Sequence, residues 1–225
     1  LDRTAFYPTS GGQPFDTGVL GSARVVEVVD GDGEVIRHVI DGSLEPGPVH
    51  GKIDWNRRFE HMQQHTGQHV LSAAFDRLLG ARTESFHLGS TSSTIDLNRT
   101  LSAAEIERAE NQANQVVWED REVSVRYASA EEATGLPLRK ESLRTGILRL
   151  IEIPGFDISA CGGTHVASTG AIGNIAVASS ERFRGGTRVE FVCGVRALGA
   201  YRVLRDAMAA SVRLVSVLPA ELPGG

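Results

Sequence analysis

The sequence contains few cysteines, no long apolar run and no excess of positive charge, and each absence excludes a class of protein. Two cysteines among 225 residues cannot build a disulfide framework, and this scarcity is typical of a reducing cytoplasm, where we expect the protein to be located. No stretch approaches the roughly 18 consecutive apolar residues of a membrane span. The first residues lack the basic start and apolar stretch of a secretory signal. We therefore expect a protein without a membrane partner.

The bulk composition is that of a soluble globular protein, with 41% apolar and 23% charged residues. A chain of 225 residues can form one large domain or two modest ones. The formal charge of −5 gives no global attraction to nucleic acid, although an acidic protein can carry a local basic surface. Because the chain begins at Leu1 rather than Met, we expect the natural protein to extend further upstream.

The first quarter of the chain is rich in glycine and in residues that favour strands. The segments ARVVEVVD (23–30) and EVIRHVID (34–41) flank the turn sequence GDG, which predicts a hairpin, and VHGKIDW (49–55) predicts a further strand. We therefore expect residues 1–54 to form a small β-barrel-like domain with a glycine-rich motif, whose first strand precedes Leu1.

After residue 54, the apolar residues change from a spacing typical of strands to one typical of a helix. Apolar spacing predicts a long helix over 56–80, with Gly80 as its C-terminal cap, and a second helix over 101–121 with a capping box at its start. Strands are expected at 83–89, 91–98, 122–129, 146–153, 173–183 and 187–194. This alternation predicts an α+β domain around a mixed or antiparallel sheet over 55–194. A C-terminal helix (195–217) and linker would occupy 195–225.

Two pairs of residues have side chains and a spacing that suit metal binding. His65 and His69 stand four residues apart on the first long helix, so both imidazoles leave the same face. Cys161 and His165 have the same spacing in the turn CGGTH, whose glycines allow the backbone to fold tightly. Three histidines and one cysteine are borderline-soft ligands that suit zinc better than magnesium or calcium. We therefore expect one Zn²⁺ ion at these four residues.

Other interpretations of these residues remain open at this point. Cys161 could be a nucleophile beside His165 as its base, or a buried thiol in an ordinary turn. A zinc peptidase is disfavoured because the helix lacks the HExxH pattern. His61 lies one turn before His65 and is a rival ligand, although packing is the simpler role for it. His87 is a half-buried strand histidine if it has no functional role.

The motifs HTGQHVLSAAF, CGGTHV and TRVEFVCGVRA resemble the editing domain of alanyl-tRNA synthetase and, more closely, its free-standing AlaX relatives. FYPTSGGQPFDTG resembles the glycine-rich stretch of the N-terminal domain in that family, and ESFHLGSTSSTIDL resembles the strand pair after its HxxxH helix. The resemblance covers essentially the whole chain. Gln68 stands where many synthetase-embedded versions carry a hydroxyl residue, which favours the AlaX branch.

The resemblance implies a hydrolase that cleaves the ester of tRNA(Ala) wrongly charged with serine, and in some members with glycine. It implies a zinc ion held by the two pairs described above, and an α/β editing domain preceded by a β-barrel domain. Within this frame, the candidate pocket residues are Thr66, His87, Ser90, Thr91, Ser93 and Gln13; ordinary strand and turn residues are the alternative. The tripeptide GGQ at 11–13 also occurs in release factors, but three residues are too few to carry that inference.

An RNA partner requires cations that contact phosphates, and arginine suits that task. The segments LPLRKESLR (136–144) and ERFRGGTR (181–188) are the local basic clusters of this acidic chain. The candidate tRNA contacts are Arg139, Lys140, Arg144, Arg182, Arg184 and Arg188; a solvated basic face is the alternative. Two other functions stay open, namely a zinc-stabilised tRNA-binding module without catalysis and an editing fragment of a full alanyl-tRNA synthetase.

Overall fold

The computed structural model describes residues 1–31, 35–140 and 146–215. In its N-terminal part, four strands form an antiparallel sheet with the order β3-β2-β1-β4. The strands are β1 (Gly18–Leu20), β2 (Ala23–Asp30), β3 (Ile36–Asp41) and β4 (Gly51–Ile53). One side of this sheet buries a small apolar cluster around Phe6, Leu20 and Val28. The predicted hairpin of β2 and β3 is confirmed.

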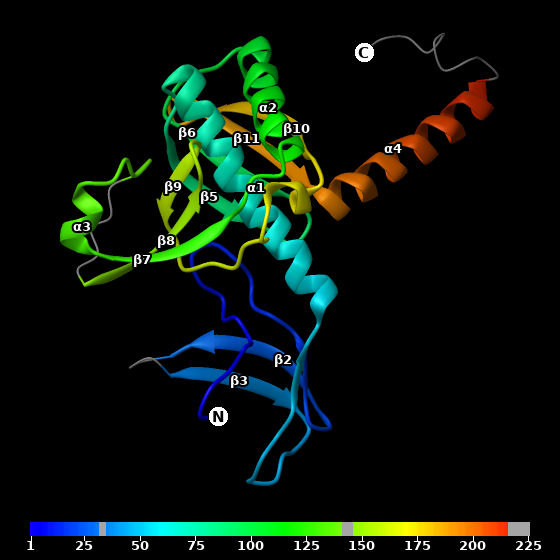
Figure 1. Ribbon diagram of the computed structural model, residues 1–225. Helices are drawn as coiled ribbons and strands as arrows, with labels where there is room; N and C mark the ends of the chain where they lie inside the picture. Colours follow the sequence, from blue (N-terminus) through cyan, green and yellow to red (C-terminus); the bar gives the residue numbers. More distant parts are fainter. Residues whose placement is uncertain (32–34, 141–145, 216–225) are drawn as a thin grey trace.

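The predicted barrel is not confirmed, because the four strands form an open sheet (Figure 1). Strands β1 and β4 contain three residues each, and among the described residues no pairing of β3 with β4 closes the sheet. A three-residue strand offers too few backbone hydrogen bonds to reach around a barrel, whose strands must tilt and stagger. Strand β1, at the end of the glycine-rich stretch, was not predicted from the sequence.

The first long helix, α1 (Trp55–Leu79), confirms the prediction in position and ends. The Asp54 side chain accepts a hydrogen bond from the Arg57 backbone N–H, and Gly80 ends the helix in the left-handed conformation that glycine adopts without a Cβ clash. Helix α2 (Ala103–Trp118) begins with the predicted capping box of Ser102 and Glu105.

The described residues after Asp54 build two antiparallel sheets, whereas the sequence predicted one. The first has the order β10-β11-β6-β5, and the second has the order β7-β8-β9. The strands are β5 (Thr83–Leu88), β6 (Ser93–Leu97), β7 (Ser124–Ser129), β8 (Ile147–Ile153), β9 (Asp157–Ala160), β10 (Ile175–Phe183) and β11 (Gly186–Cys193). The described pairs are all antiparallel, so the expected α+β class holds without the mixed sheet. Short elements escaped prediction, namely β9 and the one-turn helix α3 (Ala130–Thr134).

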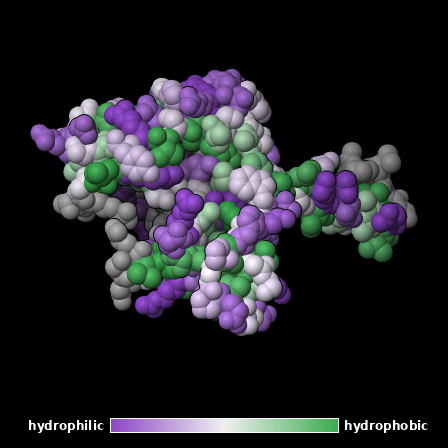
Figure 2. All heavy atoms as spheres, turned by 60° about the horizontal axis from the view of Figure 1, so that its bottom comes forward, coloured by the Kyte–Doolittle hydropathy of each residue, from purple (hydrophilic) through white to green (hydrophobic). Residues whose placement is uncertain are grey.

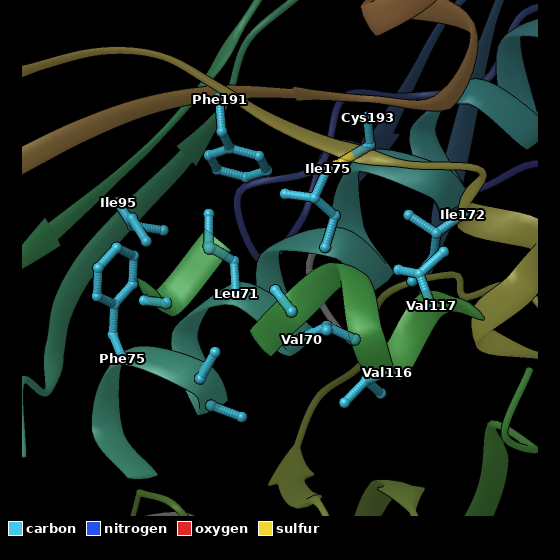
Figure 3. Close-up of a cluster of buried hydrophobic side chains, with 14 of the residues drawn as sticks. Val70, Leu71, Phe75, Ile95, Val116, Val117, Ile172, Ile175, Phe191 and Cys193 are labelled. Atoms are coloured by element: carbon cyan, nitrogen blue, oxygen red, sulfur yellow. The ribbon is translucent and has the colours of Figure 1, made fainter. Parts of the chain in front are cut away.

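The main core lies between helices α1 and α2 and the sheet β10-β11-β6-β5. Figure 3 shows Leu71 and Phe75 of α1 close to Ile95 of β6 and Phe191 of β11, with α2 contributing valines. These side chains are essentially inaccessible to solvent. Burial of each large apolar side chain contributes about 1.5–3 kcal/mol to folding. This packing holds α1 rigidly against the sheet.

Helix α4 (Gly194–Val215) projects away from the body of the molecule (Figures 1 and 2). It confirms the C-terminal helix, although the last two residues of the predicted 195–217 lie outside the described part. Its apolar residues remain exposed, including Tyr201, Leu204 and Leu214. Among the described helices, α4 included, none combines the length and apolar character that crossing a lipid bilayer requires.

Candidate metal centre

The two predicted pairs meet at one point inside the molecule. His65 and His69 come from one face of α1, and the turn after β9 brings Cys161 and His165 against that face. One potential ligand atom from each residue lies within 4.8 Å of the others. Gly163 allows this approach, because a Cβ at that position would overlap the His65 imidazole. We call these four residues the His3Cys cluster.

The spacing inside the His3Cys cluster fits a tetrahedral ion. Cys161 Sγ lies 3.3 Å from His65 Nε2 and 3.4 Å from His165 Nε2. Zinc bonds to sulfur and nitrogen at tetrahedral angles would separate those atoms by about 3.6 Å. The ring centroids of His65 and His69 lie 4.5 and 4.8 Å from that of His165. The cluster therefore presents one sulfur and three nitrogens around a common centre.

The protonation states also fit a metal. Burial would raise the pKa of the Cys161 thiol, but hydrogen bonds with His165, His65 and His69 lower it to about 2. Burial lowers the pKa of His165 to about 3 and also lowers that of His65, so both rings favour the neutral form. His69 differs: burial acts to lower its pKa, but the hydrogen bond with Asp157 raises it overall. The Cys161 thiolate and the neutral rings of His65 and His165 are in the protonation states that zinc ligands require.

Each cluster histidine has a hydrogen-bonding partner on its Nδ1 side. His65 Nδ1 lies 2.8 Å from Gln13 Oε1, His165 Nδ1 lies 3.2 Å from Thr66 Oγ1, and His69 Nδ1 lies 3.3 Å from Asp157 Oδ2. The Gln13 oxygen can only accept, so His65 donates from Nδ1 and presents a bare Nε2 lone pair to the cluster. This arrangement of outer partners is typical of metal-binding histidines.

Gln13 shows how the N-terminal part of the chain reaches the cluster. Its fully buried side chain accepts from the Thr164 backbone N–H at 3.1 Å and donates to Thr164 Oγ1 at 2.8 Å. Beside it, the Gly12 carbonyl accepts from the Leu88 backbone N–H. A Cβ on Gly12 would press into the Phe86 ring, which itself packs near His65. The glycines of the GGQ stretch therefore bring Gln13 to His65.

Arg149 holds the turn of the His3Cys cluster and was missed by the sequence analysis. Its Nη1 donates to the carbonyl oxygens of Cys161 at 2.7 Å and Gly163 at 2.9 Å. The Cys161 backbone N–H donates back to the Arg149 carbonyl. Arg149 could have been noticed because it is a charged residue in the middle of the otherwise mostly apolar predicted strand GILRLIEI.

The predicted pocket residues separate into two groups. Gln13, Thr66 and Ser93 are buried. Gln13 and Thr66 contact the cluster, whereas the Ser93 hydroxyl has no hydrogen-bonding partner within the described residues. His87, Ser90 and Thr91 are exposed, and in the described part of the chain no hydrogen bond joins them to the cluster. Their role in the pocket stays a prediction.

The predicted tRNA contacts also differ in their surroundings. Arg139 is half-buried and forms an ion pair with Asp157, and Arg188 forms a bidentate ion pair with Asp96. Lys140, Arg182 and Arg184 are exposed. Arg184 lines a hollow of about 390 Å³ with Phe183, apart from the His3Cys cluster. Arg144 lies outside the described residues.

His61, the rival ligand, does not join the cluster. Its side chain is buried one turn before His65, and its Nδ1 has no hydrogen-bonding partner within the described part. Burial, together with the nearby cations Arg57 and Arg196, lowers its pKa to about 4. Packing therefore explains the burial of His61 better than metal binding does.

The fold and the His3Cys cluster define a class of small α+β proteins with a candidate zinc site tied to a central helix. Residues 148–190, which include Cys161 and His165, match the family described as "Threonyl and Alanyl tRNA synthetase second additional domain". An alanine–tRNA ligase of Pyrococcus furiosus is 39% identical over 99% of this chain and 26% of its own length. The alanyl-tRNA editing protein Aarsd1-B of Xenopus laevis is 37% identical over 88% of this chain and 49% of its own length.

Over nearly its whole length, the chain is therefore similar to one segment of these alanine–tRNA ligases and alanyl-tRNA editing proteins. The Danio rerio protein Aarsd1 matches in the same way, at 34% identity over 88% of the chain and 49% of its own length. The chain thus spans about a quarter of the ligases and about half of the editing proteins that it matches.

Proposed function

We propose that this chain hydrolyses the ester between serine and tRNA(Ala), with one zinc ion in the His3Cys cluster and with glycine as a second amino acid substrate. The observation that carries the proposal is the cluster itself, assembled inside a segment that proteins named for alanyl-tRNA editing share. The proposed compartment is the cytoplasm, which agrees with two cysteines that are both free.

The need for such an activity follows from molecular recognition. A small pocket that selects alanine cannot strongly reject serine, because excluding one added hydroxyl gives limited discrimination. A second site that accepts the hydroxyl and cleaves the ester removes the error. Among the predicted pocket residues, Thr66 and Gln13 are next to the cluster, although both side chains already have protein partners. The exposed hydroxyls of Ser90 and Thr91 remain candidates for reading the seryl group.

In the proposed reaction, a water oxygen bonds to the ester carbonyl carbon, and the bond from that carbon to the terminal ribose oxygen breaks. The proton lost by water ends on the ribose hydroxyl, so the products are serine and tRNA(Ala). A bound zinc ion would supply a Lewis acid that polarises or positions the substrate. Around it, Gln13, Thr66 and Asp157 fix the histidine rings, and Arg149 fixes the turn, so that the site is formed before substrate arrives.

The tRNA contacts belong to the same proposal. Lys140, Arg182 and Arg184 are the candidates whose cations face solvent, so they suit phosphates best. Arg139 and Arg188 are bonded to carboxylates and suit that role less well. This division places five of the six predicted contacts in an outer and an inner group, and Arg144 lies outside the described residues.

The test is a deacylation assay with purified tRNA(Ala) charged with serine, glycine or alanine. We expect loss of the seryl ester with the native chain and no loss above background with His69→Ala, because that variant removes a cluster nitrogen. His61→Gln is the matched control, since His61 is also buried on α1 but lies outside the cluster. It should retain activity within a few fold. Equal inactivity of the native chain towards all three substrates would refute the proposal.

A tRNA-binding module without catalysis gives a different result in the same assay. It predicts that the native chain shifts tRNA(Ala) in a binding measurement but leaves the ester intact. Circular dichroism of His69→Ala distinguishes lost catalysis from lost folding. A variant that is folded but inactive supports catalysis at the cluster. An unfolded variant would direct the test to Cys161→Ser, which changes one atom.

A second candidate context is an editing segment within a full alanine–tRNA ligase. The observation that favours it is the match to several ligases over 99% of this chain. The proposed chemistry is the same, but the substrate would arrive from a synthetic site on the same polypeptide. Activity of the isolated chain on added seryl-tRNA(Ala) supports action in trans, whereas activity only after fusion to a ligase supports this second context.

A further inference from the structure

We infer that Asp157 is a positioning residue for His69, and that Arg139 and Ser159 fix Asp157 in this role. The inference rests on the proposed metal binding at the His3Cys cluster. Arg139 was predicted to contact tRNA, and no role was predicted for Asp157 or Ser159.

The contacts of Asp157 leave its carboxylate no freedom to rotate. Oδ2 lies 3.3 Å from His69 Nδ1 and accepts from Ser159 Oγ at 3.0 Å. Oδ1 accepts from Arg139 Nε at 2.8 Å. Arg139 Nη2 also donates to Ser159 Oγ at 3.0 Å, so the arginine, the serine and the carboxylate form a closed triangle. The side chain of Asp157 is 2% exposed, which removes competition from water.

The orientation of His69 follows from this triangle. A carboxylate can only accept, so it holds the hydrogen of His69 on Nδ1 and leaves Nε2 as a bare lone pair for a metal. His65 and His165 have neutral partners, an amide oxygen and a hydroxyl. His69 alone among the cluster histidines has a charged one, which makes its Nε2 the most electron-rich nitrogen of the three. Asp157 should therefore set the affinity of the cluster for its ion.

Arg139 compensates the negative charge of the buried Asp157 carboxylate. A buried charge without a partner is costly, and truncating one member of a buried pair leaves the other uncompensated. The Arg139 side chain is 15% exposed, and its backbone N–H donates to the Ile158 carbonyl on the strand that bears Asp157. The guanidinium therefore faces the interior and acts on the cluster through Asp157. Its removal should weaken metal binding even though it touches no cluster residue.

The test measures Zn²⁺ affinity of the full chain by competition with a chromophoric chelator. Asp157→Ala should bind Zn²⁺ about 10- to 100-fold more weakly than the native chain, as is usual when an outer partner of a ligand histidine is lost. Asp157→Asn keeps an acceptor but not the charge, so its loss should be smaller. Arg139→Gln should weaken binding, and Arg139→Lys should restore part of the affinity because it keeps the charge.

The control is Asp96→Asn, which breaks another Asp–Arg pair with a similar distance, at 2.7 Å against 2.8 Å. That pair lies on β6 and β11 and touches no cluster residue, so Zn²⁺ affinity should stay within about threefold. The visible spectrum of bound Co²⁺ gives a second readout. Asp157→Asn and Arg139→Gln should change its ligand-field bands, and Asp96→Asn should not. The double variant Asp157→Asn/Arg139→Gln should be no weaker than Asp157→Asn alone, because both act through one interaction.

Native Zn²⁺ affinity and an unchanged Co²⁺ spectrum in both Asp157→Asn and Arg139→Gln would overturn the inference. Equal losses in these variants and in Asp96→Asn would also overturn it, because they would indicate general destabilisation. Failure of the proposed function gives a different result, since the native chain itself would then bind neither Zn²⁺ nor Co²⁺ in a 1:1 ratio. If Asp157→Ala does not fold, the two milder variants decide the outcome.

Discussion

The two halves of the buried part of α1 are equally inaccessible but are held by different forces. Residues 61–69 are mostly polar, and residues 70–75 are mostly apolar, yet both lie inside the molecule. The Gln64 amide shows how the polar half is satisfied: it donates to the Cys193 carbonyl at 2.9 Å and accepts from the Cys193 backbone N–H at 2.9 Å. The apolar half packs mainly through non-directional contacts, and Ser72, which accepts hydrogen bonds from Gln68 and Thr83, is its exception.

This difference separates the part of the helix that stabilises the fold from the part that carries the proposed metal ligands. Apolar packing is favourable whatever the orientation of its partners, so residues 70–75 anchor α1 and supply free energy of folding. Buried polar groups cost free energy unless their hydrogen bonds are complete, so residues 61–69 require defined partners. Those partners include Gln13, Asp157 and the turn of the His3Cys cluster. Changes in the two halves should therefore have separable effects on folding and on metal binding.

The largest expected effect comes from the apolar half. Phe75→Ala should lower the free energy of unfolding by about 3–5 kcal/mol, because it empties the space between Ile95 and the helices. Urea denaturation of the metal-free protein measures this loss. The fraction that remains folded should bind Zn²⁺ with native affinity. A folded Phe75→Ala protein with tenfold weaker Zn²⁺ binding would show that the two halves are not separable.

A smaller effect is expected at Gly67, the residue of the polar half that faces the sheet. A Cβ there would overlap Cys193 Sγ, and the next nearest atom, Cys193 Cβ, would be 3.4 Å away. Gly67→Ala should therefore cost about 1–3 kcal/mol of stability from overpacking. Cys193→Ala removes the sulfur, so in that background the same substitution should cost much less. The double-mutant cycle, measured by thermal unfolding, should give a clearly favourable coupling; additive losses would contradict the close contact.

The smallest effect concerns His61, the one histidine of α1 outside the cluster. Burial lowers its pKa to about 4 from an unfolded value near 6.5. The unfolded chain therefore binds the proton first, so the contribution of His61 to stability is complete above pH 6.5 and is lost as the pH falls towards 4. His61→Gln should lose less stability than the native chain across this window in metal-free urea unfolding.

The control for this comparison is His50→Gln, because His50 is exposed. It should follow the native pH profile. The other histidines of α1 titrate equally in all three proteins, so the difference between the profiles isolates His61. Parallel profiles for His61→Gln and the native chain would show that His61 titrates normally in the folded state.

Much of the fold could be predicted from local sequence signals. The capping residues Asp54, Gly80 and Ser102 fix helix ends through their own hydrogen bonds or backbone conformation, so those boundaries follow from the sequence. The barrel was not confirmed because strand closure depends on lengths and tilts that no local pattern records. Strand β9 was missed because four residues carry too little alternation, and its identity as a strand depends on pairing with β8.

The candidate site divides in the same way. The four cluster residues were found because two pairs share a spacing that follows from helix and turn geometry. Their outer partners come from two distant parts of the chain, Gln13 from the N-terminal part and Asp157 and Arg149 from the paired strands β8 and β9, and only the fold brings them together. Arg139 carried a basic signal that suggested RNA, but its carboxylate partner is 18 residues away in sequence and could not be anticipated.

The most direct test of the account follows one sample of the native chain through removal and return of zinc. The protein is dialysed against a chelator, assayed for deacylation of seryl-tRNA(Ala), and assayed again after one equivalent of Zn²⁺ is added. The account predicts that activity disappears with the metal and returns with it, while the fold, held by the apolar half of α1, persists throughout. Full activity of the metal-free chain, or none in the zinc-loaded chain, would contradict it.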